Sequence, residues 1–178
     1  NGNSFQGKTI ELMNDVDLGG ALETPLNWKP IGYIYTDTLS FSGIFDGNNH
    51  SIKKMFIEQS LTDTVTVGLF GVVNMATIKN LFMKENVAFN IYNESNTNDY
   101  CGVLVGCSFN SNILYCYIES TLVLNTSGFG GIVGEAYYSC ISYCIFNGKI
   151  ESNIYGNGGI LGVSYYSVVN NCISMAEL

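Results

Sequence analysis

Residues 130–134 of this chain read Gly-Gly-Ile-Val-Gly, and closely related blocks of five residues recur along the sequence. The other blocks are Val67-Gly68-Leu69-Phe70-Gly71, Gly102-Val103-Leu104-Val105-Gly106 and Gly158-Gly159-Ile160-Leu161-Gly162. The steps between their final glycines are 35, 28 and 28 residues. Because self-similarity at a fixed period is the signature of repeat architectures, the blocks indicate a solenoid, a propeller or another repeat array.

The residues that follow each block also recur in the same order. Ile78, Ile113, Ile141 and Val169 stand seven residues after the final glycines, and Leu81, Cys116, Cys144 and Cys172 stand ten after. Val87, Leu122 and Ile150 stand sixteen after, and Asn90, Asn125 and Asn153 nineteen after. This spacing predicts short strands separated by turns. We assign the longer first step to extra polar residues between Ile91 and Asp99, which are expected to form a loop at one corner.

Strands this short cannot bury an apolar face alone, so each repeat must stack on the next at about 4.8 Å. The sequence therefore predicts an all-β fold, a right-handed parallel β-helix of about six coils with three short strands per coil. The hand follows from the strong preference of parallel crossover connections. A β-propeller fits less well, because its blades need about 40–50 residues.

The first 66 residues lack the glycine block but carry alternating apolar residues in segments 9–13 and 14–18. We expect residues 1–66 to form two irregular N-terminal coils and residues 67–178 to form the glycine-punctuated repeats of the same single domain. The chain starts at Asn1 and stops soon after the motif begins to recur, so we expect a fragment of a longer protein.

Composition narrows the classes of partner. The chain has seven lysines, no arginine and fifteen acidic residues, for a net charge of −8. Such a balance repels phosphate backbones and anionic headgroups, which argues against nucleic acid and membrane partners. The apolar runs 128–134 and 158–163 fall far short of the roughly 20 residues that a membrane span needs. Abundant Asn, Ser, Thr, Gly and Tyr are typical of secreted β-rich repeats, which predicts an extracellular or cell-surface location.

The order of several motifs resembles the bacterial GLUG-motif repeat proteins over nearly the whole chain. These motifs are Asn14-Asp15-Val16-Asp17-Leu18, Trp28-Lys29-Pro30-Ile31-Gly32, Phe41-Ser42-Gly43-Ile44-Phe45-Asp46-Gly47-Asn48-Asn49-His50-Ser51-Ile52, Val67-Gly68-Leu69-Phe70-Gly71 and Ile78-Lys79-Asn80-Leu81. Such domains occur in adhesin-like surface proteins and in non-catalytic regions of some immunoglobulin A peptidases. The resemblance implies a β-helical stalk or display module. The chain departs from the pattern at Cys101, which precedes Gly-Val-Leu-Val-Gly.

The six cysteines do not predict a metal site. Cys116, Cys144 and Cys172 share the repeat position of Leu81, so we expect them to stack as small hydrophobes in the core. A linear ladder does not offer tetrahedral coordination for zinc. Cys101, Cys107 and Cys140 follow no repeat position, and whether they form a disulfide is left open.

Two polar segments are candidates for catalysis. His50 is the single histidine, which excludes three-histidine zinc sites, and Asp46-Gly47-Asn48-Asn49-His50 indicates a tight turn. Asp15 and Asp17 share one strand face at about 7 Å, a distance compatible with an inverting glycosidase pair. Solvated surface acids are the favoured interpretation of this pair, and weak Ca²⁺ binding would need more oxygen ligands than two carboxylates supply.

Aromatic residues form a third candidate. Phe109, Tyr137 and Tyr165 stand three residues after the final glycines, and Tyr138 and Tyr166 stand one residue later. Stacked rings offer a carbohydrate platform, but we favour their bracing the turns between coils. Asn90, Asn125 and Asn153 are expected to form a structural amide ladder.

These features predict a non-enzymatic structural or adhesive module of a bacterial cell-surface or secreted protein. No catalytic residue, metal or cofactor is assigned. The alternatives are a carbohydrate-binding module that uses Phe109, Tyr137 and Tyr165, and a pectin-lyase-like polysaccharide-active enzyme. The enzyme should show a cleft lined by at least two carboxylates and a lysine. Expected partners are surface glycans or proteins, neighbouring repeats of a longer chain, and a second copy that covers an open end.

Overall fold

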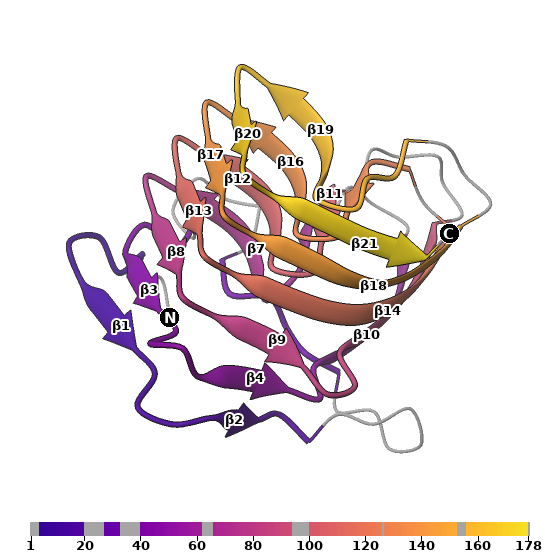
Figure 1. The fold of residues 1–178 in the computed structure, drawn as a ribbon, viewed down its shortest axis with the longest axis horizontal. Helices are drawn as coiled ribbons and strands as arrows, with labels where there is room; N and C mark the ends of the chain where they lie inside the picture. The colour runs from indigo at the N-terminus through magenta and orange to yellow at the C-terminus, as the bar shows by residue number, and fades with distance from the viewer. Residues whose placement is uncertain are drawn as a thin grey trace.

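The computed structural model describes residues 4–19, 27–32, 40–61, 66–93, 100–125, 127–152 and 156–177, except for the side chains of residues 59–61 and 93. These residues form strands and turns, with no helix among them. The strands stack in parallel as a β-solenoid of about four turns, with the chain rising from the N-terminal to the C-terminal end (Figure 1). The all-β solenoid predicted from the repeat is therefore confirmed.

The strands in the first part of the chain are β1 (Thr9–Glu11), β2 (Val16–Asp17), β3 (Ile44–Asp46), β4 (Ser51–Lys53), β5 (Phe56–Leu61), β6 (Thr66–Val67), β7 (Phe70–Asn74), β8 (Thr77–Lys79), β9 (Phe82–Lys84) and β10 (Ala88–Asn93). The later strands are β11 (Tyr100–Gly102), β12 (Val105–Phe109), β13 (Asn112–Leu114), β14 (Tyr117–Asn125), β15 (Phe129–Gly130), β16 (Val133–Tyr137), β17 (Cys140–Ser142), β18 (Ile145–Ser152), β19 (Leu161–Tyr165), β20 (Val168–Asn170) and β21 (Ile173–Glu177).

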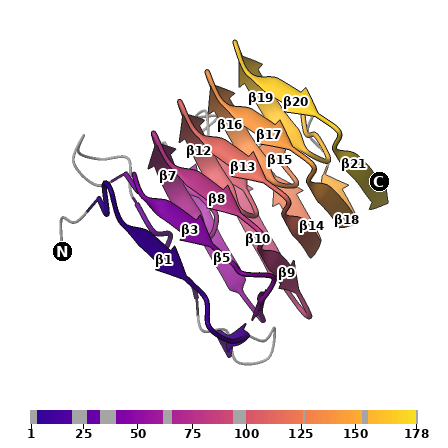
Figure 2. The same cartoon turned by 60° about the vertical axis from the view of Figure 1, so that its left-hand side comes forward.

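Successive turns of the chain place equivalent strands side by side. One sheet has the order β1-β3-β8-β13-β17-β20, and a second has the order β7-β12-β16-β19. A third joins β6, β11 and β15, and the largest sheet includes β14, β18 and β21 on one flank. Figure 2 shows the strands of successive turns following one another from β1 to β20. The pairs between described strands run parallel, as winding through one cross-section requires.

The strand register confirms the column that the sequence places seven residues after the glycine blocks. Ile78 pairs with Ile113, Ile113 with Ile141, and Ile141 with Val169. The first three side chains are fully buried, whereas Val169 in the last described turn is 46% exposed. Each turn thus buries its apolar side chains with the help of the next one.

The register also corrects two predictions. Asn90 pairs with Val123, and Asn125 pairs with Tyr92, so the predicted amide ladder is not formed by these residues. Asn153 lies outside the described residues. The cause is the position of the extra residues within the 35-residue step between the first two glycine blocks.

The offset between paired residues falls from 35 at Phe82 and Tyr117 to 33 at Phe89 and Leu122. Two of the extra residues are therefore taken up before β10, where Glu85 and Asn86 both adopt left-handed backbone angles. The prediction that all of them lie between 91 and 99 is wrong.

The glycine blocks are needed because backbones of neighbouring strands approach each other closely. A Cβ atom added to Gly134 would lie 2.6 Å from the backbone nitrogen of Cys101 and 2.6 Å from the carbonyl oxygen of Gly106. Real Cβ contacts do not come this close, so a larger residue at this position would push the strands apart. The punctuation therefore marks the tight corner between β15 and β16.

A serine ladder stabilises another corner. The hydroxyls of Ser111, Ser139 and Ser167 each accept a hydrogen bond from a backbone N–H of the preceding turn, at 3.0 to 3.2 Å. Each hydroxyl also donates to the carbonyl two residues earlier. Polar groups that the solenoid buries at this corner are thereby paired.

Candidate functional site

The structure brings the predicted aromatic residues together in one ladder along the second sheet. The rings of Phe109 and Tyr137 are stacked with centroids 4.9 Å apart, and those of Tyr137 and Tyr165 with centroids 4.7 Å apart. The ring planes differ by only 10° and 5°. Each ring therefore covers a face of the next, and the Tyr137 ring is covered on both faces.

This geometry limits how the ladder can bind a sugar. A sugar stacks on the face of an aromatic ring, but in a parallel stack the inner faces are already occupied. Phe109 and Tyr137 are half-buried, and the Tyr137 hydroxyl is taken up by a hydrogen bond to Glu135. Tyr165, at the end of the ladder, is 45% exposed and keeps one uncovered ring face. The arrangement fits bracing between coils and leaves little platform area for Phe109 and Tyr137.

Two further tyrosine ladders lie at the corners of the solenoid. Tyr138 stacks on Tyr166 at 5.2 Å, as its repeat position predicts, and Tyr115 stacks on Tyr143 at 5.0 Å. All four residues have positive φ angles, between 50° and 57°. A left-handed backbone costs a tyrosine about 1–2 kcal/mol, so stacking at these corners offsets local strain. The second ladder was not predicted, although both tyrosines stand nine residues after a final glycine.

The three cysteines at the shared repeat position do form a ladder. The thiol of Cys144 donates to the carbonyl oxygens of Ser142 and Ile113, and Cys172 makes the equivalent bonds one turn later. Cys116 and Cys144 are buried, and none of the six cysteines is in a disulfide. The packing role predicted for this column is supported by its burial.

The remaining cysteines also belong to columns, which corrects the prediction that they follow no repeat position. Cys101 pairs with Val67 and Phe129, so it fills an apolar column of β6, β11 and β15. Cys107 pairs with Val72 on one side and with Glu135 on the other. Cys140 pairs with Asn112 and Val168. The spacing from the final glycines did not reveal these columns, because the paired residues in adjacent turns differ in type.

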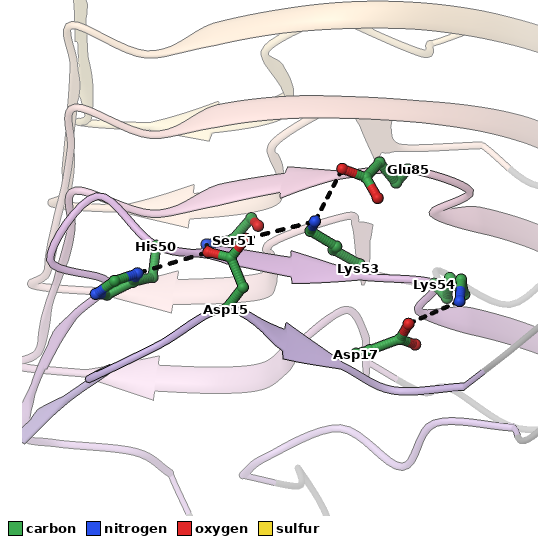
Figure 3. A network of polar contacts seen from close by, with 7 residues as sticks. All are labelled: Asp15, Asp17, His50, Ser51, Lys53, Lys54 and Glu85. Carbon is green, nitrogen blue, oxygen red and sulfur yellow. Dashed lines mark hydrogen bonds and ion pairs between the residues drawn. The ribbon is translucent and has the colours of Figure 1, made fainter.

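The acidic pair Asp15 and Asp17 lies in a lysine-rich network at the N-terminal end (Figure 3). Asp15 accepts a hydrogen bond from the Ser51 N–H at 2.9 Å and lies 3.4 Å from the Lys53 ammonium. Lys53 also contacts Glu85 at 3.0 Å. Asp17 contacts Lys54 at 2.7 Å.

These contacts set the protonation of both acids. The N–H of Ser51, with Lys53, holds the pKa of Asp15 far below its usual range, and Lys54 lowers that of Asp17. An inverting glycosidase needs one carboxyl with a raised pKa to act as general acid. Asp15 and Asp17 have the opposite property, so they fit surface ion pairs better than a catalytic pair.

The predicted turn before His50 is present. The N–H of His50 donates to the Gly47 carbonyl at 2.7 Å, and Asn48 and Asn49 have φ angles of 49° and 61°. The Nδ1 atom of His50 lies 3.5 Å from Asp15. Figure 3 draws this contact as a dashed line. His50 is therefore part of the N-terminal network.

A shallow cleft meets the criterion set for an enzyme. It encloses about 310 Å³ over β14, β18 and β21, and its lining includes Glu119, Lys149 and Glu177. Lys149 is in an ion pair with Glu151 of its own strand, and this contact raises the pKa of its ammonium group. All three lining side chains are exposed. The cleft thus contains the residue types of a polysaccharide-active site, but these charged side chains are exposed to solvent.

A buried acid stands beside the aromatic ladder. Glu135 of β16 is only 4% exposed, and burial raises the pKa of its carboxyl group. Its Oε1 accepts a hydrogen bond from the Tyr137 hydroxyl at 2.9 Å, whereas its Oε2 has no hydrogen-bond partner among the described residues. A second cavity of about 290 Å³ is lined by Glu135, Tyr165 and Tyr100 among others. Sequence analysis did not single out Glu135.

Among the described residues, no group of three His, Cys, Asp or Glu side chains is placed to hold a metal ion. No helix in the described ranges has the length and apolar character of a membrane span.

Comparison with known proteins gives one similarity. Halomucin from Haloquadratum walsbyi (strain DSM 16790 / HBSQ001) is 30% identical over 112 residues, which make up 61% of this chain and 1% of Halomucin. The chain thus spans about one hundredth of the length of that relative. No protein-family model and no solved structure matches the chain.

Proposed function

We propose that this chain is a non-enzymatic structural or adhesive module of a secreted or cell-surface protein. The observation that carries the proposal is the stacking of equivalent side chains, turn upon turn, in the column from Ile78 to Val169. Most ordered polar groups described above hold one coil to the next, and the charged residues at the N-terminal end pair with each other. The similarity to a small segment of a much larger protein is consistent with a modular building block.

The finer features of the solenoid belong to the same proposal. They are a right-handed winding, about six coils, and three short strands per coil, in a protein of the GLUG-motif type. The six-stranded sheet supports the coil number, and the right-handed preference of parallel crossovers supports the hand. When each coil is counted as three strands, the short strand β11 is part of the corner that precedes β12.

The C-terminal end of the solenoid supports stacking on further repeats. Val168, Val169, Ile173 and Met175 are exposed, although residues at equivalent positions in earlier turns are covered by the next coil. A following coil of the parent chain is the partner that fits this surface, because it would continue the same columns. A second copy of this chain on the same surface is the alternative, and sedimentation would detect it.

The proposal is tested by incubating the purified chain with acidic and neutral polysaccharides and measuring new reducing ends. We expect no turnover. Turnover that disappears in both Glu119→Gln and Lys149→Met would overturn the proposal and assign the cleft over β14, β18 and β21 to an enzyme. Glu11→Gln, an exposed acid on β1, serves as the matched control.

Glycan binding along the aromatic ladder is the second candidate. The specific support is the exposed outer edge of the ladder, where Tyr165 is half-exposed and carries a hydroxyl group. A glycan array probed with the chain should then give signals that Tyr137→Ala combined with Tyr165→Ala removes. An empty array, or signals unchanged in the double variant, would count against this candidate.

A further inference from the structure

Glu135 interrupts an otherwise apolar column in the second sheet. Its paired residues are Cys107 in the preceding turn and Val163 in the following one, and Cys107 pairs in turn with Val72. Val72 and Cys107 are buried, and the desolvation of Cys107 raises the pKa of its thiol to about 12. Burying a carboxyl group in an apolar column costs stability. Departures of this kind from the surrounding pattern are expected at functional sites.

The carboxyl group of Glu135 accepts fewer hydrogen bonds from the described residues than it has room for. A carboxylate accepts several hydrogen bonds, yet among the described residues Glu135 receives one, from the Tyr137 hydroxyl at 2.9 Å. Its Oε2 is buried without a partner among the described residues. Buried polar atoms in native proteins are nearly always paired, so this oxygen calls for a donor that the described chain does not supply.

A cavity next to Glu135 provides the space for such a donor. Glu135 forms part of its wall, and Tyr100, Tyr165, Gly128 and Gly162 form other parts. Its volume of about 290 Å³ is at the lower end of the range for small-molecule sites. Tyr137 donates a hydrogen bond to Glu135, and Tyr100 and Tyr165 line the same cavity, so three tyrosines lie around one acid. Burial and the bond to Glu135 raise the pKa of Tyr137.

We propose that this cavity binds a small molecule with a protonated primary amine, held by Glu135 and the surrounding tyrosines. The ammonium group supplies several N–H donors and a positive charge, which together satisfy the unpaired Oε2 and compensate for its lost hydration. The uncovered ring face of Tyr165 provides a surface that favours cations. A divalent metal ion fits less well, because Ca²⁺ takes six to eight oxygen ligands and Glu135 is the one acid among the described lining residues.

The amine can come from two sources, an amino sugar or a lysine-like side chain. The proposal does not depend on the structural role proposed above, since a stalk can carry a ligand site. It does bear on glycan binding, because an amino sugar would place its ring near Tyr165. The probes below separate these sources from each other and from neutral sugars.

The experiment titrates the purified chain with glucosamine, n-butylamine, glucose and N-acetylglucosamine, followed by calorimetry and by the NMR signals of Gly162 and Tyr165. We expect glucosamine or n-butylamine, or both, to bind, and the two neutral sugars not to bind. Stronger binding of glucosamine identifies an amino sugar as the source, and stronger binding of n-butylamine identifies a side-chain amine.

Glu135→Gln keeps the shape of the side chain and removes its charge. We expect it to weaken amine binding by about tenfold or more, the loss typical of a charge-assisted hydrogen bond. Glu11→Gln removes the same charge from the exposed strand β1 and should leave binding unchanged.

Three outcomes would overturn the proposal. They are no shift at about 10 mM amine, equal binding of glucose and glucosamine, and equal amine binding by the Glu135→Gln variant. Should that variant fail to fold, the comparison of charged with neutral probes on the natural chain still decides the question.

Discussion

Replacing the buried acid should make the protein more stable at neutral pH. In Glu135→Gln, the side chain still accepts the hydrogen bond from Tyr137 but no longer carries a charge next to Val163 and Cys107. The NH2 group that replaces Oε2 is also without a partner among the described residues, so the gain comes from removing the buried charge, which costs more than an unpaired neutral group. We therefore expect a gain of about 1–3 kcal/mol at pH 7, on the order of 5 °C in Tm for a chain of this size.

The sign of the pH dependence follows from the raised pKa of Glu135. The folded state holds its proton at pH values where the unfolded chain has lost it. Stability that depends on this proton is fully present below the ordinary carboxyl value of 4.5 and is lost as pH rises through the higher folded value. The variant lacks this loss, so its advantage should vanish near pH 4 and grow toward pH 7.

Paired measurements isolate this effect from the other acids. Asp15, Asp17 and Asp46 have lowered pKa values and destabilise both proteins alike when acid is added. Their contribution cancels in the difference between the two urea midpoints measured from pH 4 to pH 7. A difference that stays constant over this range, or that shrinks as pH rises, would refute the assignment of a raised pKa to Glu135.

Four further predictions follow from the ladders and the tight corners. Gly134→Ala should cost about 1–3 kcal/mol or more, because its Cβ would lie 2.6 Å from backbone atoms of the preceding turn, and urea unfolding measures this loss. Ser139→Ala should cost about 1–3 kcal/mol by leaving a buried N–H unpaired, with faster amide exchange at that corner. Tyr138→Val should destabilise by more than Tyr138→Asn, because a β-branched residue fits a φ of 50° poorly, and their Tm values give the order. A thiol reagent should titrate six cysteines in denaturant but react quickly only with Cys140 and Cys172 in the native protein, since the other four are buried.

The repeat period accounts for how much of the fold could be predicted. A β-branched aliphatic seven residues after each glycine block identified a column that the strand register reproduces, from Ile78 to Val169. Counting worked there because each turn between the block and this column has the same number of residues. It failed beyond Leu81, where Glu85 and Asn86 take up two extra residues before β10 and shift the partners of Asn90.

The candidate site was harder to predict for a different reason. Glu135 stands one residue after a final glycine, in the position of Val72, Cys107 and Val163, so the signal was present in the sequence. The period gives its column but not its burial, because only the structure shows that Glu135 is 4% exposed and bonded to Tyr137. The lysine partners of Asp15 and Asp17 were missed because the irregular N-terminal coils carry no period that aligns them.

Each turn of a solenoid packs its side chains in the same way. A residue that differs in type from the others in its column therefore needs a separate explanation. The tyrosines at left-handed corners recur in consecutive turns and stack on each other, which identifies them as part of the repeated structural solution. Glu135 does not recur. If it served stability, Glu135→Val would weaken the protein, although valine occupies the same position at Val72 and Val163. A Glu135→Val variant that is more stable yet no longer binds amines would show that this position exchanges stability for recognition.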